Sequence, residues 1–253
     1  MPTLQNLVLL PRPRHITPLP GVCNAAHSTP RTEIRSGNGI PAQGYRFRIS
    51  KKGVAITASD AAGAFYGAMT LRQIQRQCNG ALPACEIEDH PDFPARGVLL
   101  YISGGKVPTM ETLFALIDDL AEWKINHLEL GIEHTFAYRN HRKVWARASP
   151  MTHMEIRKLD AYCRERFIEL VPHQQSFGHL ARWLELPRYR KLAEDPKKPF
   201  GLCPTDPNSP MISATLISRK VRHLKKMDFH PTTILCCSCW FFTPKTTRFS
   251  VAS

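Results

Sequence analysis

Acid–base side chains follow two apolar stretches of this sequence, at the point where each stretch ends. Glu133 and His134 come directly after one stretch, and another leads into a polar segment from His173 to His179 that contains Gln175. Carboxylate, imidazole and amide groups bind hydroxyl groups and can move protons. His173 and His179 lie six positions apart, which is not the spacing of a helical zinc pair. We therefore expect a polar binding loop without a metal site, and an ordinary solvated loop is the alternative.

Three apolar runs alternate with two helical patterns in the middle of the chain, and these elements must position the polar residues. The runs cover residues 98–103, 125–132 and 168–172, and the helical patterns cover residues 109–124 and 153–166. Strands alternating with helices of this length predict βα units around a parallel sheet. In barrels built from such units, the chemistry lies in the loops at the C-terminal ends of the strands. The polar residues fall in these loops.

The ends of the second helical pattern carry two local signals. Thr152 and Glu155 form a capping box, which predicts the start of the helix. Phe167 stands where a glycine would normally end such a helix before a strand. If this position needs a left-handed backbone, the phenylalanine costs roughly 1–2 kcal/mol.

An earlier part of the chain predicts a small α+β domain. Residues 45–49 and 54–58 alternate apolar and polar side chains around a Lys-Lys-Gly turn, which is typical of a β-hairpin with one buried face. Asp60 can cap the helix that follows, and Gly63 and Gly67 would permit close approach to the sheet. The expected apolar stripe of this helix is Ala64, Phe65, Ala68, Met69, Leu71 and Ile74. Residues 85–88 return as a strand, and a proline-rich joint follows at residues 89–94.

Composition limits the class of protein. The chain has 253 residues, 43% of them hydrophobic, and no apolar run of membrane-spanning length, so we expect a globular protein without a membrane partner. No convincing signal peptide is present, which predicts a cytoplasmic location. The eight cysteines are expected to be free thiols, with a disulfide framework or a metal site at residues 236–239 as alternatives. The net charge of +13 includes seven basic residues against one acidic residue in positions 211–253, but no nucleic-acid motif accompanies them, so we do not expect nucleic-acid binding.

Residues 45–210 resemble family 20 glycoside hydrolases, the β-N-acetylhexosaminidases. The hairpin, the stretch from Asp60 to Leu71, and the stretch from Ile87 to Gly97 carry this resemblance. It implies an α/β protein in which a small N-terminal α+β domain precedes a partial (β/α)8 TIM barrel. The expected division is residues 1–44 as a weakly structured segment or edge strand, 45–92 as the N-terminal domain, 93–210 as the partial barrel and 211–253 as a basic, cysteine-containing tail.

The resemblance also implies a chemistry, in which the substrate's own N-acetyl oxygen attacks the anomeric carbon. An Asp orients that group, and an adjacent Glu protonates the leaving oxygen. The sequence contains no Asp-Glu dipeptide, and the stretch from Arg96 onward is shorter than the roughly 200 residues of a complete barrel. We therefore expect a truncated or frame-altered product that is inactive and has no catalytic residue of its own.

Five residues are implied to bind the sugar of an N-acetylhexosamine-containing glycan, without a cofactor: Arg96, His179, Glu133, His134 and Gln175. A structural ion pair is the alternative for Arg96, and a satisfied core histidine is the alternative for His179. Tyr101 stands where the family usually has Asp, and Gly104 where it usually has Arg, so part of the implied site is altered. Two further functions stay open, a non-catalytic carbohydrate-binding remnant and an anionic-surface or nucleic-acid binder that uses the basic tail.

Overall fold

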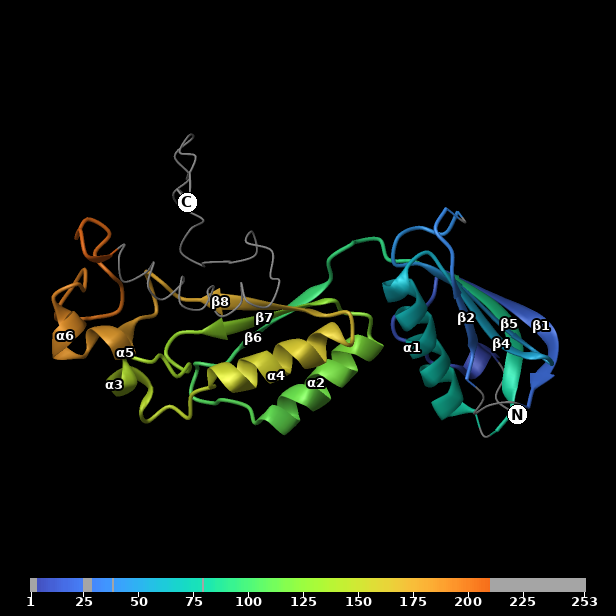
Figure 1. The fold of residues 1–253 in the computed structure, drawn as a ribbon, viewed down its shortest axis with the longest axis horizontal. Coiled ribbons are helices and arrows are strands. Elements are labelled where there is room, and N and C mark those ends of the chain that lie inside the picture. The colour runs from blue at the N-terminus through green and yellow to red at the C-terminus, as the bar shows by residue number, and fades with distance from the viewer. Residues whose placement is uncertain (1–3, 25–28, 38, 79, 210–253) are drawn as a thin grey trace. The chain divides into compact units, whose positions relative to one another are not determined.

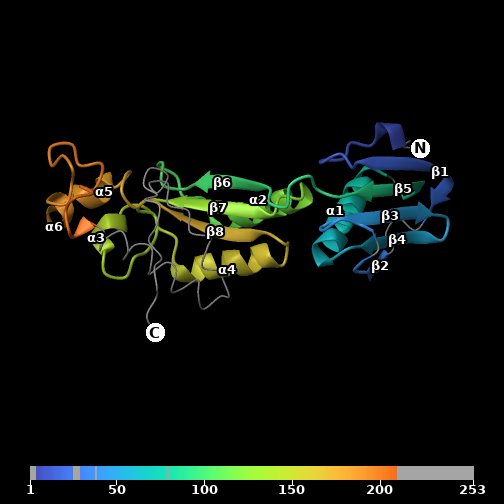
Figure 2. The same cartoon turned by 90° about the horizontal axis from the view of Figure 1, so that it is seen from above.

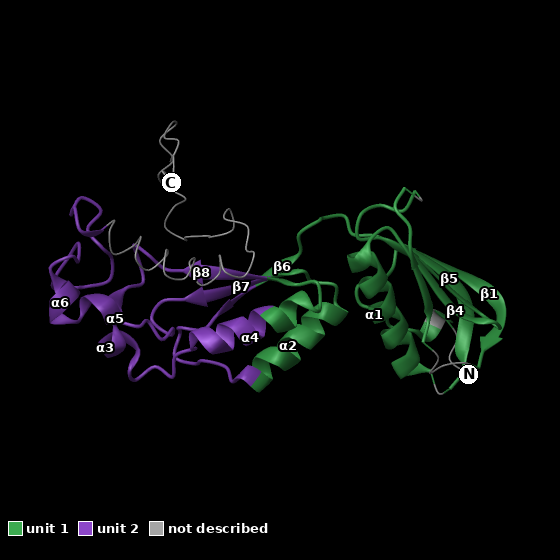
Figure 3. Cartoon of the chain, in the orientation of Figure 1, with its two compact units in different colours: residues 1–98, 111–127, 161–169 green, residues 99–110, 128–160, 170–253 purple. Residues whose placement is uncertain are grey.

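A computed structural model describes the chain except for residues 1–3, 25–28, 38, 79 and 210–253. The basic tail and the cysteine cluster at 236–239 lie outside the described residues. The chain divides into two compact units (Figure 3): unit 1 holds residues 1–98, 111–127 and 161–169, and unit 2 holds residues 99–110, 128–160 and 170–253. Each unit is described by itself.

Unit 1 contains a five-stranded sheet (Figure 1), and Figure 2 shows its strand order, which is β1-β5-β3-β4-β2. Its strands are β1 (His15–Cys23), β2 (Arg31–Ile34), β3 (Tyr45–Ser50), β4 (Gly53–Ala58) and β5 (Leu82–Asp89). The pairs are antiparallel except β2 with β4, which is parallel. Residues 1–44 thus supply both edge strands, preceded by the short 3-10 helix η1 (Leu4–Asn6).

The predicted hairpin is β3 and β4, and its alternation follows the two faces of the sheet. Phe47 and Ile56 are opposite each other and buried. On the other face, Arg46 pairs with Glu88 of β5 at 2.8 Å, and Arg48 pairs with Glu86 at 3.1 Å. One face of the sheet therefore forms the core, and the other is covered by cross-strand ion pairs.

Helix α1 (Ala61–Gln77) packs on the apolar face of this sheet. The predicted cap is confirmed, since the Gly63 amide donates to Asp60 Oδ1 at 2.8 Å. A Cβ on Gly63 would lie 2.2 Å from the carbonyl oxygen of Gly44, and one on Gly67 would lie 2.9 Å from Ile56 Cγ2. The glycines therefore set the distance between helix and sheet. The predicted apolar stripe is largely confirmed: Leu71 and Ile74 belong to the core, and Ala64, Phe65 and Ala68 are partly buried and pack against it. The prediction did not include Tyr66, Thr70 and Gln73, which are also buried.

A second sheet has the order β6-β7-β8 (Figure 2), with β6 (Gly97–Tyr101), β7 (His127–Ile132) and β8 (Glu169–Gln174). Hydrogen bonds at the two ends of the strands show that it is parallel. At the N-terminal ends, Asn126 donates to the Arg96 carbonyl and Glu169 donates to the Asn126 carbonyl. At the C-terminal ends, Ile102 donates to the Gly131 carbonyl and Gln175 to that of Ile132. The predicted parallel arrangement is confirmed, with strand ends shifted by at most two residues.

Helices α2 (Met110–Glu122) and α4 (His153–Arg164) connect these strands. The predicted capping box is present: the Thr152 amide donates to Glu155 Oε2 at 2.7 Å, and the Glu155 amide donates to Thr152 Oγ1 at 3.2 Å. Phe167 adopts the left-handed conformation that its position requires, with φ of 56°, and Lys124 does the same after α2, with φ of 60°. Both helices thus end in the turn that normally selects glycine.

Three short helices, α3 (Arg142–Trp145), α5 (Ala181–Leu184) and α6 (Pro187–Arg190), lie in the loops of unit 2. The architecture is α/β. In the part of the chain that the structure describes, no helix combines the length and the apolar character that a membrane crossing requires.

Candidate functional site

The loops after β7 and β8 bring four of the five predicted residues to one edge of the parallel sheet. Glu133 and His134 directly follow β7, Gln175 directly follows β8, and His179 lies four residues further on. All four belong to unit 2. Because parallel strands end at the same edge, residues far apart in sequence meet here.

Hydrogen bonds from the end of β6 fix the backbone of Glu133. Its amide donates to Ser103 Oγ at 2.8 Å, and Ser103 Oγ in turn lies 2.7 Å from Thr135 Oγ1. Ser103 and Thr135 are both buried. The Glu133 carbonyl accepts from Gln174 Nε2 at 3.3 Å and from Trp183 Nε1 at 3.2 Å. The residue is therefore held from both sides, as a positioned functional group must be.

The carboxylate of Glu133 is the centre of the cluster. The Tyr101 hydroxyl donates to Oε1, and Nδ1 of His179 lies 3.3 Å from the same oxygen. Burial raises the pKa of Glu133, and the nearby His179 opposes this effect. A carboxyl group with a raised pKa between two polar side chains can accept hydrogen bonds from hydroxyl groups and can also exchange a proton.

His134 is buried beside Glu133, with its Nδ1 3.6 Å from Glu133 Oε2. Burial lowers the pKa of His134, and the charge of Arg182 lowers it further. His134 is therefore neutral at neutral pH, and its contact with Glu133 is not an ion pair. Its Nδ1 has no hydrogen-bond partner.

His179 and Gln175 differ in accessibility. The side chain of His179 is 54% exposed and its ring lies 4.8 Å from that of Phe200, so it is not a core histidine. Its backbone has a φ of 56°, an uncommon left-handed conformation for a non-glycine residue. Gln175 is only 6% exposed. His179 is thus exposed to solvent, whereas Gln175 is buried.

Arg96 is not brought together with the other four residues. It belongs to unit 1 and precedes β6, whereas the others follow β7 and β8. Its guanidinium donates to the carbonyl oxygens of Lys124 and Phe93, at 2.8 Å each, and to Gln43 Oε1 at 3.0 Å. These contacts favour a structural role for Arg96, which was the alternative to sugar binding. The partners of the guanidinium are oxygens of carbonyl and amide groups, whereas the alternative assumed an ion pair with an acidic residue.

Four residues of the cluster were not among the predicted site residues: Tyr101, Ser103, Thr135 and Gln174. Tyr101 had been noted only as a departure from the family pattern, yet its hydroxyl binds Glu133. Ser103, Thr135 and Gln174 have small or amide side chains at strand ends. In the sequence, only their position next to an apolar run indicated that they could belong to the site. Among the described residues, no group of three or more His, Cys, Asp or Glu side chains has the geometry of a metal site.

Sequence comparisons relate the chain to known proteins. Residues 13–90 match the profile described as glycosyl hydrolase family 20, domain 2. A beta-hexosaminidase of Porphyromonas gingivalis is 29% identical over 181 residues, which are 62% of this chain and 23% of that protein. A lacto-N-biosidase of Bifidobacterium bifidum is 27% identical over 178 residues, 69% of this chain and 16% of that protein. The chain therefore spans only a minor part of these relatives.

Solved structures show the same fold. A chitobiase of Flavobacterium johnsoniae superposes with a TM-score of 0.74 over 88% of this chain and 44% of that chain, at 19% identity. A crystal structure of a beta-N-acetylhexosaminidase gives a TM-score of 0.72 over 86% of this chain and 51% of that chain, at 20% identity. At such identities the likeness concerns the fold.

Proposed function

We propose that this chain, which resembles part of a family 20 β-N-acetylhexosaminidase, binds the terminal sugar of an N-acetylhexosamine-containing glycan through the loops after β7 and β8. The profile match, the beta-hexosaminidase relatives and the structural neighbours support the family context. The relatives' names supply the substrate class. In this proposal, β6 to β8 are the first strands of a barrel, residues 45–92 form the N-terminal domain and residues 93–210 the partial barrel.

The Glu133 cluster carries the proposal. Hydrogen bonds of the Glu133 backbone hold this residue in place, and Tyr101 and His179 both contact Oε1 of its carboxylate. Such a carboxylate is suited to accept hydrogen bonds from vicinal sugar hydroxyls. His179 and Tyr101 are exposed members of the cluster and would contact the ligand first. Gln175 and His134 are buried polar groups that would support the loops from below.

Turnover by these 253 residues is not part of the proposal. The substrate-assisted mechanism requires an Asp-Glu pair, and the sequence contains none. Glu133 alone offers one carboxylate, whereas the reaction divides two tasks between two carboxyl groups. Binding without hydrolysis is the function that the present residues support.

Isothermal titration calorimetry with N-acetylglucosamine tests the binding site. We expect weak saturable binding that falls about tenfold in Glu133→Gln, because a charged acceptor is lost. Glu185→Gln, which alters an exposed carboxylate at the end of α5, is the matched control and should bind like the original chain. Equal affinity of the Glu133→Gln and Glu185→Gln variants would contradict the assignment.

A further inference from the structure

Basic side chains are concentrated in two segments of unit 2. Residues 1–210 contain 27 basic and 20 acidic side chains, an excess of seven. Residues 134–152 and 175–193 together hold eight of the basic side chains and only one of the acidic ones. The rest of residues 1–210 therefore carries equal numbers of both signs. Both segments continue the proposed sugar site, because one follows Glu133 and the other begins with Gln175.

The eight basic side chains of these segments are all exposed, and we call them the basic rim. The first segment contributes Arg139, Arg142, Lys143 and Arg147. The second segment contributes Arg182, Arg188, Arg190 and Lys191. None of the eight forms a salt bridge with another residue that the structure describes. The rim is therefore a group of exposed positive charges without acidic partners among those residues.

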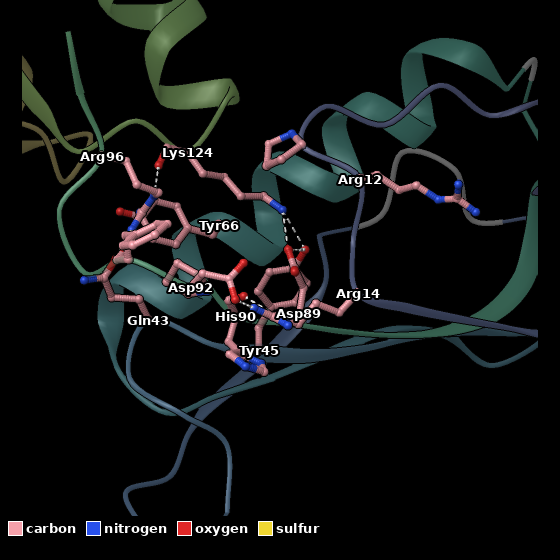
Figure 4. Close-up of a pocket in the computed structure, with 13 residues that line it drawn as sticks. Arg12, Arg14, Gln43, Tyr45, Tyr66, Asp89, His90, Asp92, Arg96 and Lys124 are labelled. Carbon is pink, nitrogen blue, oxygen red and sulfur yellow. Dashed lines mark hydrogen bonds and ion pairs between the residues drawn. The ribbon is translucent and has the colours of Figure 1, made fainter.

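Cations in unit 1 are arranged differently. Figure 4 shows a pocket of unit 1 in which Lys124 Nζ lies 2.7 Å from Asp89 Oδ2 and Arg14 pairs with Asp92. Carboxylates neutralise these cations, whereas those of the basic rim keep their charge. Charges of one sign that are not neutralised add up to a field that attracts a partner of opposite charge.

The three short helices that carry most of the basic rim are packed together. Figures 1 and 2 show α3, α5 and α6 side by side at one end of unit 2. The ring of His141, just before α3, lies 5.1 Å from that of Trp183 in α5, and its Nδ1 shares a hydrogen bond with the hydroxyl of Tyr189 in α6. Trp183 Nε1 also donates to the Glu133 carbonyl at 3.2 Å. The basic rim is therefore held beside the proposed sugar site.

The side chains around the basic rim limit the class of anionic partner. No phenylalanine, tyrosine, tryptophan or large aliphatic side chain in residues 134–152 and 175–193 is exposed. These segments thus lack the aromatic platforms on which the bases of single-stranded nucleic acids stack. They also lack the apolar groups that anchor a protein to a lipid surface. A sugar chain that carries negative charge needs neither feature.

We propose that the basic rim binds an anionic glycan, whose sulfate or carboxylate groups pair with the rim while a neighbouring sugar unit occupies the site at Glu133. The location of that sugar unit rests on the proposed function. Six of the eight rim cations are arginines, whose planar N–H groups match pairs of oxygens on carboxylate groups and on tetrahedral oxyanions. Burial lowers the pKa of His134, and the charge of Arg182 lowers it further, so the field of the rim reaches the residue next to Glu133.

Isothermal titration calorimetry of the complete chain with three oligosaccharides that contain N-acetylglucosamine tests the proposal. Keratan sulfate carries sulfate groups, hyaluronan carries carboxylates, and desulfated keratan is the neutral control. We expect at least one anionic form to bind at least tenfold more tightly than the neutral form, with an advantage that shrinks as sodium chloride is added. Anionic forms that bind no more tightly than the neutral one would overturn the proposal. So would a single-stranded DNA oligomer of equal charge that binds as tightly as the better anionic glycan.

Paired substitutions locate the binding surface. Arg142→Gln/Lys143→Gln removes two charges from the basic rim and should weaken binding of the anionic glycan at least fivefold. Lys51→Gln/Lys52→Gln removes two exposed charges from the turn between β3 and β4 and should change the affinity less than twofold. Equal weakening in both variants would show general charge attraction. No weakening in the rim variant would place the anion elsewhere on the chain. Either result would overturn the proposal.

A second rim variant and the neutral oligosaccharide complete the test. Arg188→Gln/Arg190→Gln, in α6, should also weaken anionic binding at least fivefold and replaces the first rim variant if that one does not fold. Neutral binding that depends on Glu133, without any gain from sulfate or carboxylate groups, would overturn the role of the rim and leave the proposed function intact. Anionic binding that depends on the rim, without binding of the neutral form, would support the rim and contradict the site at Glu133.

Discussion

At the scale of single residues, the site depends on how Glu133 is held rather than on its presence alone. The sequence placed Glu133, His134, Gln175 and His179 after strands, and the structure puts each of them there. It could not predict that Tyr101 reaches Glu133, because that contact joins two strands that are neighbours only in the folded sheet. Nor could it predict the surroundings of Arg96, whose acceptors are carbonyl groups without a sequence signal.

The titration of Glu133 should appear in the pH dependence of stability. Burial raises its pKa in the folded state, so folding favours the protonated form. The stabilising contribution is therefore complete below the unfolded value of 4.5 and is lost as pH rises through the folded value. Glutamine does not titrate, so we expect the Glu133→Gln variant not to lose stability in this way as the pH rises. The Tm of the variant minus the Tm of the original chain should therefore increase from pH 4 to pH 7. Parallel melting curves at both pH values check this, and a relative Tm that falls with rising pH would refute it.

Helix α1 lies too close to the Gly44 carbonyl for any side chain at position 63. We expect Gly63→Ala to lower the free energy of unfolding by about 3 kcal/mol, because the added Cβ meets the Gly44 carbonyl oxygen at 2.2 Å. Gly178→Ala is the control, since nothing lies within 4 Å of its added Cβ. Urea denaturation of both variants gives the difference. Similar stabilities would mean that helix and sheet are further apart than described.

At the scale of elements, helix boundaries were predicted best where the signal is local. The capping box of α4 needs only Thr152 and Glu155, three residues apart, and both of its hydrogen bonds are present. The left-handed position of Phe167 was anticipated because glycine normally occupies it. Lys124, in contrast, was assigned to the end of its helix, although it has the same left-handed backbone. Its burial against Asp89 arises from tertiary contacts that no helix pattern contains.

The strain at Phe167 can be measured by comparing two truncations. Phe167→Gly and Phe167→Ala both remove the ring, which lies 5.3 Å from that of Phe65, but only glycine adopts a φ of 56° without steric cost. We expect the glycine variant to be more stable than the alanine variant by about 1–2 kcal/mol. Chemical denaturation of the two variants measures the difference between their free energies of unfolding. An alanine variant at least as stable as the glycine variant would exclude backbone strain at this turn.

At the scale of the whole molecule, the α/β architecture followed from periodicity, but the sheet order of unit 1 did not. The alternation in β3 and β4 predicted their hairpin. Strand β1 contains Pro18 and Pro20 and pairs with β5 through an irregular register, so its sequence gave only a weak strand signal. Pairing over such distances in the chain is decided by the packed core, which no local pattern reveals.

In the proposed function, the chain is a sugar-binding part of a β-N-acetylhexosaminidase-like protein. Its fold superposes on such enzymes, and its loops after β7 and β8 present a carboxylate with polar partners. It lacks the Asp-Glu pair on which the reaction depends. In the proposed function, the chain therefore binds the sugar without turning it over.

The most direct test follows both properties in one sample. The purified chain is mixed with p-nitrophenyl N-acetyl-β-glucosaminide, and NMR records saturation transfer from the protein to the sugar together with any release of p-nitrophenol. We predict transfer to the N-acetylglucosaminyl protons, reduced in Glu133→Gln, and no p-nitrophenol above the buffer control. Release of p-nitrophenol by the chain, or the absence of transfer at millimolar sugar, would contradict the account.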